Sequence, residues 1–168
     1  HKGDWHVAFD VYKKHIYSTF DFTYYDRPIQ EQYRKQLISH FTFLYGHDIY
    51  NPKTNVFDID RFLDEGEANF GGYDYMLLWH DYPRMGVDNR DQFKMYEDLP
   101  GGLKGLKLMV DRAHDRGVKV YLPYKPWDLM VKNQNHYIEE ARISKAIGAD
   151  GVFLDTMGEG AIEFRKAL

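Results

Sequence analysis

The chain has no cysteine, no long apolar run and no cluster of basic residues. Without cysteine its 168 residues form no disulfide and no thiolate metal site. No apolar segment is long enough to span a bilayer and none has the form of a signal peptide, so we expect no membrane partner. The net charge is −4 and no Lys/Arg run is present to neutralise phosphates, which argues against a nucleic-acid partner.

The absence of cysteine does not define the compartment, because many secreted bacterial enzymes also lack it. We favour a secreted or periplasmic location over a cytoplasmic one. The chain begins at His1 rather than Met, and Ala161–Leu168 starts a helical pattern that stops without a cap or breaker. We therefore expect the sequence to be part of a longer protein.

Aromatic residues are abundant. They make up 17% of the chain, with 14 Tyr, 11 Phe and 3 Trp. Such rings build cores, but they also form flat platforms on which sugars and protein partners stack. Many of the Tyr and Trp residues lie near expected turns, which favours a binding cleft.

The hydrophobic pattern divides the chain into two parts. Residues 1–37 are expected to form an N-terminal helix, with apolar residues at helical spacing from Trp5 to Ile16, and an aromatic lead-in segment. In residues 38–168, strand patterns alternate with helix patterns, and a long loop covers His80–Gly102. The expected strands are His40–Tyr45, Tyr73–Trp79, Val118–Leu122 and Gly151–Leu154, and the expected helices lie around Ile59–Leu63, Leu103–Ala113 and Tyr137–Ile147.

This alternation predicts an α/β fold with a parallel sheet. The strands follow one another at roughly 30 to 45 residues, as βαβ units do. A doubly wound sheet is the alternative, but no Gly-rich phosphate loop follows the first strand. We predict a (β/α)8 TIM-barrel type, present as about its first four β/α units, because a whole barrel needs about 250 residues. Half a barrel leaves two sheet edges open, which the missing half or another copy of the chain would cover.

Function in such barrels collects on the loops that follow the strands. Trp79 ends the second strand and His80 follows it, Lys125 follows the third strand, and Asp155 follows the fourth. Indole rings beside carboxylates suit a carbohydrate, because rings stack on its apolar face while carboxylates bind hydroxyl groups. The candidate substrate-binding residues are Trp79, Asp81, Tyr82, Tyr124, Trp127, Asp128 and Glu159.

Three segments resemble a known superfamily. Asp150–Glu159 (DGVFLDTMGE) is similar to the nucleophile strand of the α-glucosidase/α-xylosidase family. Leu99–Lys104 (LPGGLK) and Arg116–Pro123 (RGVKVYLP) resemble the second and third βα units of the wider superfamily that includes the α-galactosidases. The resemblance covers roughly His40–Glu159, and the order and spacing of the motifs carry most of it.

The resemblance implies a retaining glycoside hydrolase that acts on α-linked sugars, with Asp155 as the catalytic nucleophile. The carboxylate would attack the anomeric carbon to form a glycosyl-enzyme ester, which water then hydrolyses. The general acid/base would lie on a later strand, beyond Leu168. No cofactor is implied.

Other interpretations of the same residues stay open. Asp155 is a favoured residue type for a helix N-cap, and Trp79 and Trp127 are also suited to a core. The protein as a whole is alternatively a carbohydrate-binding barrel without catalysis. A metal-dependent barrel hydrolase is a weaker alternative: His47-Asp48 and His80-Asp81 follow neighbouring strands, but no H-x-H or H-x-x-x-H spacing occurs, and we expect no metal site.

Overall fold

The computed structural model describes residues 3–80, 87–130, 135–158 and 160–168. Contacts divide the chain into two compact units, His1–Gln36 and Leu37–Leu168. The candidate site residues all belong to the second unit, and each unit is described by itself.

The first unit consists of helices α1 (Trp5–Thr19), η1 (Pro28–Gln30) and α2 (Glu31–Arg34). The N-terminal helix predicted from the apolar spacing is confirmed as α1. Its start is capped by Asp4, whose carboxylate accepts a hydrogen bond from the backbone N–H of His6 at 2.9 Å. None of the residues of α1 is buried.

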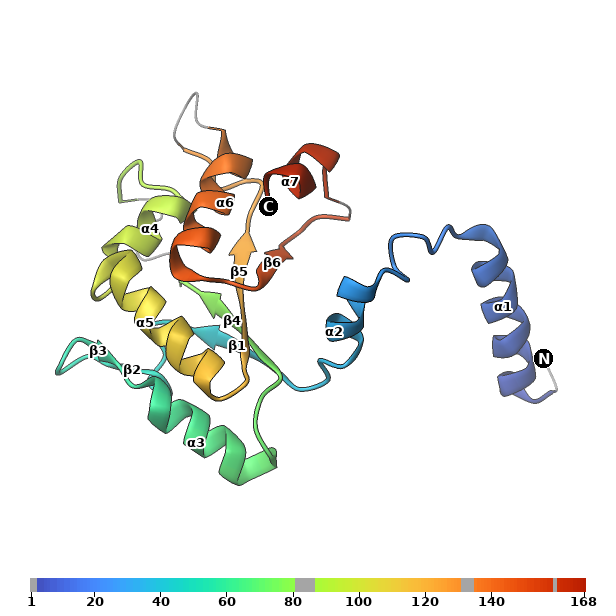
Figure 1. Ribbon diagram of the computed structural model, residues 1–168, viewed down its shortest axis with the longest axis horizontal. Helices are drawn as coiled ribbons and strands as arrows, with labels where there is room; N and C mark the ends of the chain where they lie inside the picture. The colour runs from blue at the N-terminus through green and yellow to red at the C-terminus, as the bar shows by residue number, and fades with distance from the viewer. Residues whose placement is uncertain (1–2, 81–86, 131–134, 159) are drawn as a thin grey trace. The chain divides into compact units, whose positions relative to one another are not determined.

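The second unit is a mixed α/β structure around a parallel four-stranded sheet (Figure 1). Its strands β1 (Ser39–Phe43), β4 (Tyr75–Trp79), β5 (Lys119–Tyr124) and β6 (Gly151–Leu154) lie side by side in chain order. The reversal of strand order that defines a doubly wound sheet is absent from these strands. The sequence therefore predicted the fold class and the parallel sheet correctly.

The connections between the strands are helical and run along one side of the sheet (Figure 1). Asp58 and Asn135 cap two of the helices through their side chains, and Gly71 and Gly148 end the same helices with φ of 85° and 82°. The helices of this unit are α3 (Ile59–Phe70), α4 (Gln92–Asp98), α5 (Gly102–Asp115), α6 (His136–Ile147) and α7 (Ile162–Ala167).

Two elements differ from the expectations. Helix α4 occupies part of the segment His80–Gly102, which was expected to be a loop, and buries Phe93, Met95 and Tyr96. A hairpin of β2 (Tyr50–Asn51) and β3 (Val56–Phe57) lies between β1 and α3. Both are too short for their hydrophobic period to stand out in the sequence.

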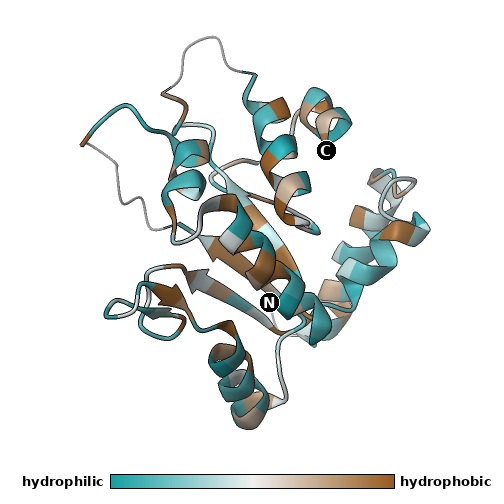
Figure 2. Ribbon diagram, turned by 60° about the vertical axis from the view of Figure 1, so that its left-hand side comes forward, coloured by the Kyte–Doolittle hydropathy of each residue, from teal (hydrophilic) through white to brown (hydrophobic). Residues whose placement is uncertain are grey.

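The two faces of the sheet have different surroundings. Met76, Leu78 and Val120 point into the main core, which they share with residues of α3, α5 and α6. Leu77, Trp79 and Tyr121 point the other way and form a second, smaller cluster. Three large rings on this second face remain exposed: Phe41 (42%), Phe43 (50%) and Phe153 (45%). Figure 2 shows the hydropathy of the residues along the strands.

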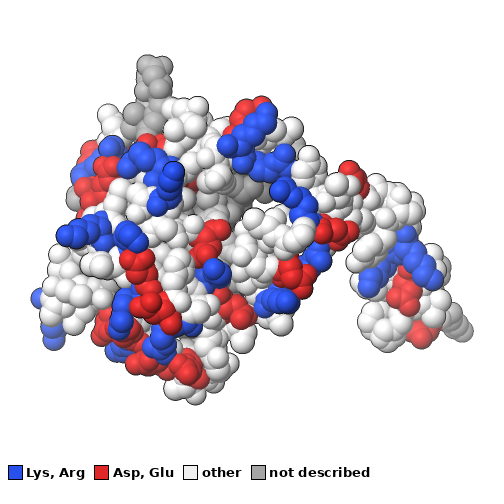
Figure 3. All heavy atoms as spheres, in the orientation of Figure 1, with Lys and Arg blue, Asp and Glu red and all other residues white. Residues whose placement is uncertain are grey.

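The surface of the second unit carries many ion pairs. Arg112 of α5 and Arg116, which caps the end of that helix, reach across to acidic residues of α3; one such contact joins Arg112 Nη2 and Asp60 Oδ2 at 2.8 Å. Figure 3 shows acidic and basic side chains interspersed over one face of the molecule. Exposed pairs of this kind contribute only about 0–1 kcal/mol each. Across the described ranges, each helix is too short or too polar to cross a membrane.

Candidate functional site

The carboxyl ends of the strands form one rim, because the sheet is parallel. Tyr124 pairs with Leu154 at the end of β5 and β6. Beyond this pair the backbone N–H of Asp155 donates to the carbonyl oxygen of Tyr124 at 3.0 Å. The N–H of Leu44 similarly donates to the carbonyl of Trp79 at 2.8 Å. Asp155 therefore lies at the rim where strand-end residues were expected to meet.

Asp155 is half-buried and is followed by a strained backbone. Thr156 has φ of 58°, in the left-handed region that a β-branched residue rarely adopts. Strain of this kind costs on the order of 1–3 kcal/mol and is concentrated at functional sites. Asp155 is also not a helix cap, because α7 begins at Ile162 with Ala161 in the cap position. The structure thus removes the main alternative interpretation of Asp155.

A buried lysine interacts electrostatically with Asp155. Lys125 follows β5 directly and has no exposed surface. Its Nζ lies 2.5 Å from Nε2 of His80 and 4.5 Å from the centre of the Trp79 ring. Burial lowers the pKa of Lys125 to about 7, against the opposing effect of the carboxylates of Asp128, Glu140 and Asp155. The lysine thereby links the ends of three neighbouring strands.

Gln92, the first residue of α4, holds the loop that follows β5. Its Nε2 donates to the carbonyl oxygens of Lys125 at 2.6 Å and Asp128 at 2.8 Å. Its Oε1 accepts from the backbone N–H of Lys125 at 2.8 Å. Because Gln92 is fully buried, these bonds are shielded from water, and the position of Lys125 depends on them.

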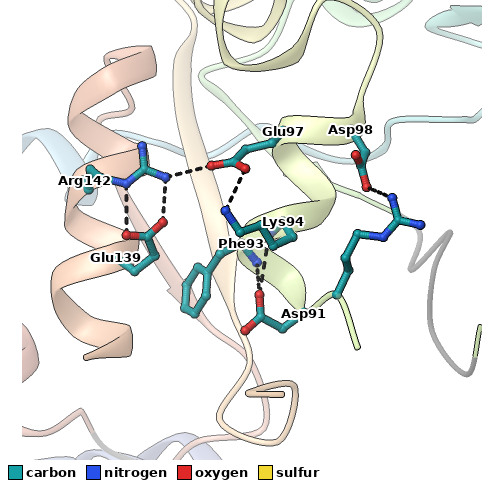
Figure 4. A network of polar contacts seen from close by, with 8 residues as sticks. Asp91, Phe93, Lys94, Glu97, Asp98, Glu139 and Arg142 are labelled. Atoms are coloured by element: carbon teal, nitrogen blue, oxygen red, sulfur yellow. Dashed lines mark hydrogen bonds and ion pairs between the residues drawn. The ribbon is translucent and has the colours of Figure 1, made fainter. Parts of the chain in front are cut away.

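Helix α4 is in turn anchored to α6 by a network of polar contacts (Figure 4). Arg142 of α6 donates to Glu97 of α4 at 3.1 Å and also pairs with Glu139 on its own helix. Asp91 caps α4 by accepting from the backbone N–H groups of Phe93 and Lys94. The Asp91 cap fixes the start of α4, where Gln92 holds the β5 loop, and Arg142 joins Glu97, near the other end of α4, to α6.

Trp127 and Asp128 line a hollow of about 390 Å³ beyond the end of β5. Trp127 is 49% exposed, whereas Asp128 is only 6% exposed. Oδ2 of Asp128 is buried without a hydrogen-bond partner among the described residues, and burial raises the pKa of this carboxyl. An exposed indole in a hollow of this size is an arrangement on which a sugar ring can stack.

The structure places the other predicted binding residues differently. Trp79 is 7% exposed and packs against Phe41, with ring centres 4.7 Å apart. Tyr124 is 2% exposed and lies on the helix side of β5, against Phe164 of α7 at 4.6 Å. The burial of Tyr124 puts it in the core and away from the hollow. Asp81, Tyr82 and Glu159, also predicted to bind substrate, lie outside the described residues.

Glu140 is a second buried charge that the sequence analysis did not select. It lies on α6 with no exposed surface, and neither Oε1 nor Oε2 has a hydrogen-bond partner within the described part of the chain. Burial raises its pKa to about 8, against the opposing charge of Lys125. A signal was present in the sequence, because Glu140 occupies an apolar position of the helix, in line with Ile143 and Ile147.

The histidine–carboxylate pairs in the described ranges do not assemble into a metal site, and one of them, His114–Asp150, lies before β6 at the amino ends of the strands, away from the rim. His40 Nε2 lies 3.9 Å from Asp48 Oδ2 after β1, and His114 of α5 pairs with Asp150 at 2.7 Å. No group of three or more His, Asp or Glu among the described residues is arranged to hold a metal ion.

Comparisons with known proteins give little guidance. No protein-family model matches the chain, and no curated protein matches it. The crystal structure of a beta-arabinopyranosidase, a glycosidase by name, aligns with 71% of this chain at 17% identity and a TM-score of 0.37. The chain spans 18% of the length of that protein. A likeness this distant does not establish a family, including the α-glucosidase/α-galactosidase superfamily that the motifs resemble.

Proposed function

We propose that the protein is a retaining glycoside hydrolase acting on α-linked sugars, with Asp155 as its nucleophile. The observation that carries this proposal is the rim: the half-buried carboxylate of Asp155 interacts electrostatically with Lys125, and the loop of Lys125 continues to Trp127 and Asp128, which line the hollow. A sugar stacked on the exposed Trp127 ring would lie in the hollow that Asp128 also lines.

The proposed architecture is the first half of a (β/α)8 barrel. Two features support it: the strands follow chain order with helices on one side, and the opposite face is lined with aromatic rings. In a closed barrel that face points inward and is covered by side chains of the other strands. β1 and β6 each have one partner strand in the sheet, so the missing half or a second copy of the chain would pair with them.

Asp155 fits the role of nucleophile for two reasons. A nucleophilic carboxylate must be ionised, and the ammonium form of Lys125 is a cation close enough to interact with it. The left-handed Thr156 turns the chain directly after Asp155, and such strain is retained where a side chain must point in one direction. The proposed general acid/base lies beyond Leu168, as the motif resemblance implies.

A trapping experiment tests the nucleophile without the general acid. Fluoride leaves without protonation, so 5-fluoro-α-glycosyl fluorides of several sugars would form the glycosyl-enzyme ester with Asp155 alone. We expect mass spectrometry to locate one added sugar on the peptide that contains Asp155. Asp155→Asn should reduce labelling by about 10³-fold or more, while Asp115→Asn, on the exposed end of α5, should leave it unchanged.

The alternative of carbohydrate binding without catalysis predicts a different result. Sugars would then bind, and would bind more weakly to Trp127→Ala, but no 5-fluoroglycosyl group would be transferred to Asp155 of the wild-type protein. Labelling of the folded Asp155→Asn variant at the wild-type rate would also refute the nucleophile assignment. Circular dichroism on both variants separates a chemical effect from unfolding.

A further inference from the structure

Helix α6 carries a row of polar side chains where an apolar face would be expected. His136, Glu140 and Ser144 follow one another at four-residue spacing, so they lie along one side of the helix. Glu140, in the middle of the row, has no exposed surface, and Ser144 is only 8% exposed. The rest of the protein therefore covers the row.

Each of the three side chains has a buried polar atom without a hydrogen-bond partner among the described residues. These atoms are Nδ1 of His136, both carboxylate oxygens of Glu140 and Oγ of Ser144. Buried polar groups are almost always hydrogen-bonded, either to protein or to ordered water, because an unpaired one costs stability. Four such atoms on one side of one helix indicate a shared partner.

The neighbouring side chains lie close to Glu140 but do not bind it directly. The hydroxyl group of Ser144 favours the charged form of Glu140, as does the charge of Lys125, yet neither oxygen of Glu140 has a hydrogen bond within the described ranges. Tyr124 of β5 is 2% exposed, and burial, followed by the charges of Tyr137 and Glu140, raises its pKa to about 12. Polar groups that are near each other without bonding directly are commonly bridged by water.

The chemistry of the row suits water better than a metal ion. No group of three or more His, Asp or Glu in the described part of the chain is arranged to hold a metal. An ionised carboxylate only accepts hydrogen bonds, whereas a hydroxyl group both donates and accepts. A water molecule can donate to the carboxylate of Glu140 and exchange a hydrogen bond with Ser144 at the same time.

We propose that the α6 row holds internal water between Glu140 and its two polar neighbours, His136 and Ser144. A buried water makes about three hydrogen bonds, so four unpartnered atoms correspond to about one or two molecules. This water would hydrate a glutamate that no side chain pairs. The site is separate from the proposed hydrolysis, because none of the three residues lines the hollow of Trp127.

Oxygen-17 magnetic relaxation dispersion tests the inference, because it counts the water molecules that stay in a protein longer than its tumbling time. The full chain is measured beside the double variant Glu140→Met/Ser144→Ala. Methionine has nearly the volume of glutamate but no oxygen that binds water. We expect the dispersion amplitude of the double variant to be lower by about one or two waters per chain.

Matched variants define where the water lies. Glu140→Gln keeps hydrogen-bonding groups in the same shape and should retain the wild-type amplitude. Glu65→Met changes an exposed glutamate of α3 in the same way as Glu140→Met and should also leave the amplitude unchanged. Ser144→Ala alone removes a single oxygen and should lower the amplitude, so the test remains decisive if the double variant does not fold.

Two results would overturn the inference. One is a wild-type protein with no long-lived water, and the other is an amplitude that stays at the wild-type value in the folded Ser144→Ala and double variants. Circular dichroism shows which variants are folded. The measurement involves neither a sugar nor Asp155, so this inference and the proposed hydrolysis can fail independently.

Discussion

Replacing Glu140 by Gln should stabilise the protein at neutral pH. Glu140 is fully buried, and neither carboxylate oxygen has a hydrogen-bond partner within the described residues. Its pKa rises from 4.5 to about 8 on folding, chiefly because burial penalises the charged form. A group with a raised pKa in the folded state contributes its full stability below pH 4.5, and this contribution is lost as the pH rises through about 8.

The size of the effect follows from the shift. Each pKa unit corresponds to about 1.4 kcal/mol, so the wild-type protein should lose up to about 3 kcal/mol between pH 5 and pH 7 through Glu140. Glu140→Gln removes this dependence and should be more stable at pH 7 by a similar amount. Lys125 adds little to the pH dependence between pH 5 and pH 7. Its pKa falls from 10.5 to about 7 on folding, so it changes the free energy of unfolding mainly between pH 7 and pH 10.5.

The assay is urea unfolding followed by far-UV circular dichroism at pH 5, 6 and 7, with the free energy of unfolding extrapolated to water. Glu65→Gln is the matched control: Glu65 is exposed on α3 and pairs with Arg61 at 2.9 Å, so its loss should cost only about 0.3–0.5 kcal/mol. If Glu140→Gln is less stable than the wild type at pH 7 and keeps the wild-type pH slope, Glu140 is ionised and well paired in the folded state, and the reasoning is wrong.

Two further predictions concern the rim. Gln92→Ala should destabilise the protein by about 2–4 kcal/mol in the same urea assay, because the buried backbone groups of Lys125 and Asp128 lose their hydrogen-bond partner. The control is Gln32→Ala: Gln32 is exposed, and its loss should change stability by less than about 0.5 kcal/mol. Thr156→Gly should raise the free energy of unfolding by about 1 kcal/mol, because glycine adopts a positive φ without the strain of a β-branched residue. The same variant should slow glycosyl transfer to Asp155. Thr54→Gly is the control: Thr54 lies in a turn without a positive φ, so this change should not stabilise the protein. An unchanged or lower stability of Thr156→Gly would contradict the assignment of strain.

The sequence by itself determined the alternation of strands and helices and the position of Asp155. Helix α5 and its Gly117, which has φ of 76°, follow from the apolar spacing and from the preference of glycine for that conformation. Strand β6 ends where the apolar run ends, so Asp155 lies at the carboxyl rim of any parallel sheet built from these strands. These are local properties, read from neighbouring residues.

Only the tertiary structure decided which strand-end side chains share a site. Tyr124 and Lys125 are adjacent, so their side chains point to opposite faces of the sheet. Which of the two enters the core depends on the face that α6 and α7 cover. In the structure Tyr124 packs against Phe164 of α7, and Lys125 contacts Trp79 and His80. The burial of Lys125 likewise depends on Gln92, which is 33 positions earlier in the chain. Hydrophobic periodicity describes one element at a time, whereas desolvation and the pKa shifts it causes arise from the elements packed around a group.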